Sequence, residues 1–124
     1  MAGKSYRDLD VWREAVDFVA ECYRMTRAFP KGEVYGLTSQ LQRAAVSIPA
    51  NIAEGQGRQH EREFLQHLAI AYGSLAEVET HIQIARRLEY VEGEKENQML
   101  ERAAQIGRML NGLRKSIEKR FGDR

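Results

Sequence analysis

The chain of 124 residues is poor in the residue types that cross-links, sharp turns and membrane spans require. It has one cysteine, Cys22, so no disulfide can form within it, and only two prolines, which favours helices throughout. No apolar run approaches the roughly 20 residues of a membrane span. The first ten residues also lack the apolar core of a signal peptide. We therefore expect a protein of the reducing cytoplasm that makes no membrane contact.

An excess of one charge sign is also missing. The formal net charge is +1, from 19 Lys and Arg against 18 Asp and Glu, so no bulk attraction to nucleic acid or anionic lipid is expected. The apolar share of 43% and the charged share of 30% are typical of a globular protein. No repeat or long linker divides the sequence, and its length suits a single domain over residues 1–124.

Apolar residues recur at helical spacing through most of the chain. The pattern predicts four helices, at about residues 8–27, 37–54, 60–88 and 94–119. Pro49 lies inside the second pattern, whose apolar phase continues across it, so we expect one kinked helix. The string Gly55-Gln56-Gly57 is predicted to end that helix with a left-handed glycine. Short connections predict an all-α fold, an antiparallel up-down-up-down four-helix bundle.

The first predicted helix carries two apolar sets. One central stripe runs through Trp12, Ala15, Val16, Val19, Tyr23 and Thr26, and one flank repeats every seven residues at Val11, Phe18 and Met25. Together they cover about half the circumference, more than a single core demands. We therefore predict that the flank forms a contact between copies of the chain. The alternative is a wide intramolecular face covered by loop residues such as Phe29 and Tyr35.

No residue cluster matches a known catalytic or metal-binding pattern. Carboxylate-bridged metal sites in helical bundles use Glu-x-x-His pairs. The residues three positions before His60, His67 and His81 are Gly57, Phe64 and Val78, so that motif is absent. The serines lack a glycine-flanked elbow and a base partner. We expect no enzymatic activity, no cofactor, no metal and no small-molecule substrate.

Polar residues occupy helix positions where a solvated face would carry Lys and Glu. They form a predicted polar cluster of Arg43, Ser47, Asn51, Glu54 and Glu79. Glu79 lies between Leu75 and Ile82 in an apolar stripe, and a buried carboxylate needs a cation or several donors. Arg43 is the candidate partner, with Tyr72 as an alternative. We interpret the cluster as a buried ion pair that fixes helix register; binding of a ligand is the alternative.

Basic residues gather at the end of the fourth predicted helix. The candidates for contact with nucleic acid are Arg114, Lys115, Lys119 and Arg120. A solvated helix end matched to the helix dipole is the favoured explanation of these residues. A modest electrostatic contact with RNA or DNA is the functional interpretation, and assembly of several copies would multiply it.

Three segments resemble one protein family. They are YRDLDVWREA, FPKGEVYGLTSQLQRAAVSIPANIAEG and FLQHLAIAYGSLAEVETHIQIARRLEYV, and the likeness extends over about residues 6–117. They resemble the four-helix bundle proteins encoded in intervening sequences of bacterial 23S ribosomal RNA genes. This resemblance implies a homopentamer without enzymatic activity. The fold is also similar to the accessory protein of diversity-generating retroelements, a pentamer that engages a reverse transcriptase and nucleic acid through basic surfaces.

The chain departs from this pattern in two respects. It is nearly neutral, and it has Gln59 and His60 where a Ser or Thr cap before the third helix would be usual. The sequence therefore favours a non-catalytic, oligomeric structural or interaction module that serves as a platform for a protein or ribonucleoprotein partner. The alternative is an accessory factor that binds RNA or another nucleic acid.

Overall fold

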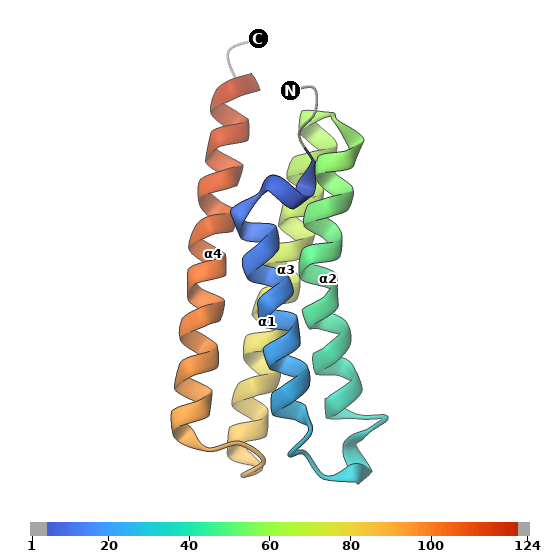
Figure 1. Cartoon of the computed structure of the whole chain (residues 1–124), viewed down its shortest axis with the longest axis vertical. Helices are drawn as coiled ribbons and strands as arrows, with labels where there is room; N and C mark the ends of the chain where they lie inside the picture. The colour runs from blue at the N-terminus through green and yellow to red at the C-terminus, as the bar shows by residue number, and fades with distance from the viewer. Residues whose placement is uncertain (1–4, 122–124) are drawn as a thin grey trace.

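The structure is a computed structural model that describes residues 5–121. The chain forms four long helices and two short 3-10 turns. The turn η1 (Tyr6–Asp8) precedes the first long helix, and η2 (Lys31–Glu33) precedes the second. The long helices are α1 (Asp10–Thr26), α2 (Leu37–Arg58), α3 (Glu61–Arg87) and α4 (Gly93–Phe121). Successive helices run in opposite directions along one long axis (Figure 1). The predicted all-α, antiparallel four-helix bundle is confirmed.

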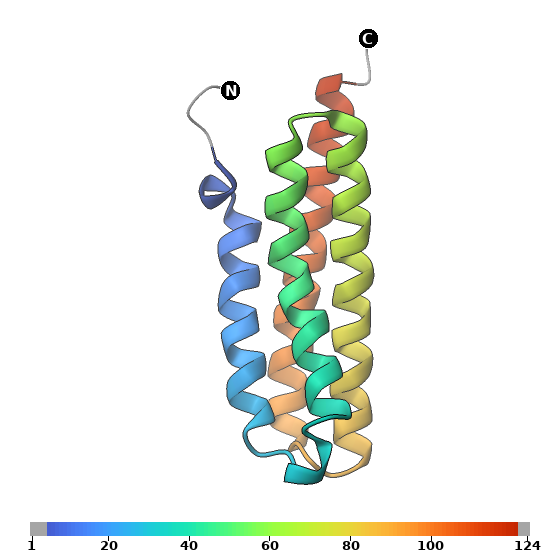
Figure 2. The same ribbon diagram turned by 90° about the vertical axis from the view of Figure 1, so that its right-hand side faces the viewer.

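The helices form a closed ring in cross-section. Each helix packs against its neighbours in sequence, and α1 also packs against α4. Helices α1 and α3 lie at opposite corners of the ring, as do α2 and α4 (Figures 1 and 2). The axis of the bundle is filled by side chains with almost no exposure, including Phe18, Ile48, Ile82 and Ile106. Burial of this apolar stripe from every helix is the main source of stability.

Pro49 lies in the middle of α2 without ending it. The helix continues for more than two turns beyond this proline, as the unbroken apolar phase predicts. The predicted turn at residues 55–57 is wrong. Helix α2 ends at Arg58, and the left-handed residue is Gln59, with φ 62°. Gly55 instead sits where α3 comes very close, because an added Cβ would lie 2.7 Å from the Cβ of His67.

A hydrogen-bonded clamp ties two loops together at the end of the bundle opposite η1. The Glu33 carboxylate accepts a hydrogen bond from the Leu37 backbone N–H at 3.0 Å, which caps α2. It also accepts one from the Tyr90 hydroxyl at 2.8 Å, from the connection between α3 and α4. The Tyr90 ring packs against Phe29 with ring centroids 5.5 Å apart. Both helix connections at this end are thereby held in place.

Candidate interaction surfaces

A chain of polar contacts joins α2 to α3. The Ser74 hydroxyl donates to the Ser47 hydroxyl at 2.8 Å. The Asn51 amide donates to the same Ser47 oxygen and to the Ser47 carbonyl, each at 2.9 Å. The Asn51 carbonyl oxygen lies 2.9 Å from Nδ1 of His67. We call these four residues, Ser47, Asn51, His67 and Ser74, the α2/α3 polar seam.

Two charged side chains extend the α2/α3 polar seam toward solvent. Glu54 lies 3.9 Å from Nε2 of His67 and makes an ion pair of 3.0 Å with Arg58, four residues further along α2. Because the Asn51 amide oxygen can only accept, Nδ1 of His67 is the donor in this contact. The imidazole is therefore turned to Asn51 and Glu54, with no bond to either serine. This arrangement fixes helix register and activates no nucleophile.

The structure brings together three members of the predicted polar cluster, Ser47, Asn51 and Glu54. Sequence reasoning missed their partners His67 and Ser74. The available signal was their seven-residue spacing, which continues to His81 and places all three on one side of α3. His81 is buried, and neither of its ring nitrogens has a hydrogen-bond partner among residues 5–121. The Glu77 carboxylate at 3.7 Å from Nε2 is too distant for a hydrogen bond.

The predicted pairing of Glu79 with Arg43 is wrong within one chain. Arg43 is exposed on the outer side of α2. Glu79 is half-buried in a groove of about 310 Å³ between α3 and α4, which Tyr72 also lines. Burial raises the pKa of Glu79, and the groove lies on the side of α3 away from α2. Glu79, which lies in the apolar stripe of α3, therefore faces the neighbouring helix α4 and not the polar cluster.

The predicted subunit contact through Val11, Phe18 and Met25 is contradicted, because all three are buried within one chain and Phe18 has no exposed surface. The flank of α1 packs into the bundle core, and part of the central stripe lies outside the core. Burial of Tyr23 in the core would cost the hydration of its hydroxyl, whereas Phe18 carries no polar group. The flank therefore enters the core together with Ala15 and Thr26 of the central stripe, while Val16 and Tyr23 of that stripe are exposed.

Large apolar side chains are exposed along α1 and α2. Exposure is 38% for Val16, 41% for Tyr23 and 43% for Val46. The Gln42 amide donates to the Thr26 hydroxyl at 3.0 Å, which sets the register of the two helices. One turn back along α1 and one turn on along α2 therefore places Tyr23 beside Val46.

The same stepping extends this exposed surface along both helices. Further turns pair Val19 with Ala50 and Val16 with Ala53. Val19 and Ala53 are partly exposed, and Ala50 is exposed. We call this surface the α1/α2 apolar face; it consists of Val16, Val19, Tyr23, Val46, Ala50 and Ala53. A contiguous apolar face of this kind on a small protein usually marks an interaction site.

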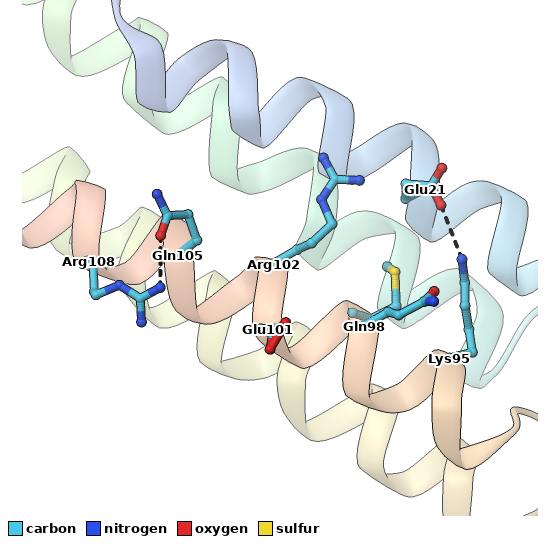
Figure 3. A pocket seen from close by; sticks show the side chains of 8 residues that line it. Glu21, Lys95, Gln98, Glu101, Arg102, Gln105 and Arg108 are labelled. Atoms are coloured by element: carbon cyan, nitrogen blue, oxygen red, sulfur yellow. Dashed lines mark hydrogen bonds and ion pairs between the residues drawn. The ribbon is translucent and has the colours of Figure 1, made fainter.

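A polar groove of about 690 Å³ lies between α1 and α4 (Figure 3). Lys95 reaches across it to Glu21, with an N–O distance of 3.2 Å, and Arg102 lies 3.9 Å from Glu14. The neighbouring Lys95 and Arg24 lower the pKa of Glu21. Arg108 donates to the side-chain oxygen of Gln105 at 2.8 Å. Most cations of this groove are thus matched by groups of the chain itself.

The four predicted nucleic-acid contacts do not share one face. Arg114 makes an ion pair with Glu118 at 3.2 Å. At 100° per residue, Arg114 and Arg120 point about 120° apart around α4. Lys115 and Lys119 are both exposed on the outer side of α4, and Arg108 lies on the same side two turns earlier. The structure therefore separates Arg114 and Arg120 from a small basic stripe of Arg108, Lys115 and Lys119.

Two kinds of feature are absent from residues 5–121. No helix in this range is long and apolar enough to cross a membrane. Within the same residues, no three His, Cys, Asp or Glu side chains are grouped so that they could hold a metal ion. Cys22 is buried in the core, and burial raises the pKa of its thiol to about 12.

Comparison with known proteins agrees with this architecture. The family described as 23S rRNA-intervening sequence protein matches residues 7–112. The chain belongs to this family. Among solved structures, it is similar to a protein of unknown function from the S23 ribosomal protein family of Bacteroides thetaiotaomicron, with a TM-score of 0.76 and 23% identity. The similarity covers 85% of this chain and 98% of that one, and at this identity it shows the fold. No curated protein matches the chain.

Membership of the family accounts for the resemblance of the segments within residues 7–112. The matched range begins just before α1 and ends within α4, so it includes the α2/α3 polar seam and the α1/α2 apolar face. Lys115 and Lys119 lie beyond it. The surfaces on α1 and α2 are thus within the family's shared region, whereas most of the basic stripe is not.

Proposed function

We propose that this protein is a non-catalytic, self-assembling helical module of the cytoplasm that serves as a platform for a larger complex. The α1/α2 apolar face carries this proposal. It leaves Val16, Tyr23 and Val46 about two-fifths exposed, and association of copies would remove this apolar area from water. The α2/α3 polar seam supports the non-catalytic part of the proposal, because its serines bond to each other and to Asn51 and act as structural groups.

The mass of the purified protein in solution tests self-assembly. Light scattering at micromolar concentration should give a multiple of the 14.2 kDa chain mass, and a pentamer corresponds to 71 kDa. Tyr23→Glu and Val46→Glu should each lower that mass, since a charge would then be buried at the contact. Ser116→Glu, on the outer side of α4, is the matched control and should leave it unchanged. A wild-type mass of 14.2 kDa would refute the proposal.

A second candidate function is binding of RNA or a ribonucleoprotein. The observation in its favour is the basic stripe of Arg108, Lys115 and Lys119, since an oligomer would present one stripe for every copy. Binding to a structured RNA should weaken steeply with salt and should fall when Lys115 and Lys119 are replaced by Ser. Arg114→Ser should have less effect, because Glu118 already neutralises Arg114. If the purified wild-type protein retains no RNA at low salt, this function is excluded.

A further inference from the structure

Two charged side chains on different helices have no charged partner. Among residues 5–121, neither Arg43 nor the Glu79 carboxylate makes an ion pair or a side-chain hydrogen bond. Arg43 is exposed beside the α1/α2 apolar face. It lies three residues before Val46, so the two side chains are about 60° apart around α2. Glu79 is half-buried, where a carboxylate is most in need of a cation. The two groups are therefore electrostatically complementary.

The fold keeps these two groups apart within one chain. Arg43 lies on the outer side of α2, and Glu79 lines the groove between α3 and α4. Helices α2 and α4 occupy opposite corners of the bundle (Figure 1). An ion pair between them can form only when a second copy presents one group to the other.

The groove around Glu79 also has room for side chains from another surface. Part of its wall consists of residues with one side-chain carbon or none, Ala76, Ala103, Ala104 and Gly107, beside larger residues that include Tyr72 and Leu75. A Cβ added to Gly107 would lie at an ordinary contact distance of 3.5 Å from Leu75. The α1/α2 apolar face has the opposite character, since the larger side chains of Tyr23 and Val46 are exposed there.

We propose that the groove between α3 and α4 receives the α1/α2 apolar face of a second copy, whose Arg43 pairs with Glu79. This inference rests on the proposed self-assembly and names the two surfaces that meet. The surfaces lie on different sides of the chain, so the contact is heterologous and repeats head to tail. Arg108 is the other cation at the groove, and its guanidinium is already engaged by Gln105 at 2.8 Å.

Charge reversal tests this pairing. Arg43→Glu and Glu79→Arg should each raise the dissociation constant of the assembly about 30-fold or more, because like charges would then meet at the contact. The double variant should recover at least a tenfold part of that loss. Lys31→Glu and Glu92→Arg reverse exposed charges in the loops and are matched controls that should leave association unchanged.

A mixing experiment separates the contact from any damage to folding. Copies with Arg43→Glu carry two acidic groups at the contact, and copies with Glu79→Arg carry two basic groups. Each alone should disperse, with unchanged helical circular dichroism, and a mixture should associate because each contact between the two kinds of copy joins opposite charges. Failure of the mixture or of the double variant to recover association would overturn the pairing.

The outcomes also distinguish this inference from the proposed function. A wild-type oligomer whose mass is insensitive to either single reversal would overturn the Arg43–Glu79 pairing and leave self-assembly intact. Another partner would then occupy the groove. A wild-type chain that stays at 14.2 kDa would overturn both.

Discussion

Replacement of Gly55 by alanine tests the close approach of α2 and α3. Gly55 is buried in the last turn of α2 and faces α3. An added Cβ would lie 2.7 Å from the Cβ of His67 and 3.0 Å from Cδ1 of Phe64. The Cβ of His67 is fixed to the helix backbone, so it cannot rotate away. Helices α2 and α3 must therefore separate by several tenths of an ångström or more.

Two opposing effects decide the size of the change. Alanine gains roughly 1 kcal/mol over glycine in a helix interior. Overpacking of a tight contact costs roughly 1–3 kcal/mol. Separation of the helices would also lengthen the 2.9 Å contact between His67 and Asn51, and a side-chain hydrogen bond contributes about 1 kcal/mol. The net expectation for Gly55→Ala is a destabilisation of about 1–2 kcal/mol.

Urea unfolding followed by circular dichroism at 222 nm measures this change, with all variants at one protein concentration because assembly shifts apparent stability. Gly112→Ala is the matched control. Gly112 lies inside α4 with no heavy atom within 4 Å of an added Cβ, so alanine there should stabilise the chain by about 1 kcal/mol. If Gly55→Ala stabilised the protein as much as Gly112→Ala does, the inferred close approach would be wrong.

Three further predictions concern single groups. The Cys22 thiol should not react with an aromatic disulfide reagent at pH 8 until the chain unfolds, since it is buried and its pKa is about 12. Hydrogen bonds from Leu37 and Tyr90 lower the pKa of Glu33, so its contribution to stability is complete above the ordinary value of 4.5 and is lost as pH falls below it; Glu33→Gln should flatten this acid limb in thermal melts. His60 makes no side-chain cap at the start of α3, so His60→Ser should raise the free energy of unfolding by about 1 kcal/mol, and an unchanged urea midpoint would contradict that.

The helices were predictable because their apolar residues keep one period over many turns. The same period predicted an unbroken α2 across Pro49, where local propensity alone suggests a break. The end of α2 was not predictable in this way. Gly55 reads as a turn residue, and its actual role is to let a neighbouring helix approach, which no local pattern reveals.

The side of α1 that enters the core was also beyond sequence reasoning. Two apolar sets of similar width compete on this helix, and only packing against the other three helices decides between them. Phe18 fits the interior and Tyr23 keeps its hydroxyl in water. The polar cluster was half predictable for a related reason: residues on one helix could be grouped by spacing, but partners on another helix depend on the register between helices.

The polar seam between α2 and α3 gives the bundle an uneven internal stiffness. Its hydroxyl and amide contacts are tied to particular residues, so a slide of one helix turn would break every bond at once. Helices α1 and α4, by contrast, share the smallest mutual contact in the ring. The central hairpin should therefore behave as one cooperative unit with the slowest amide exchange, while the first and last helices loosen from it earlier. One copy can therefore exchange its first helix with a neighbouring copy while its central hairpin stays folded.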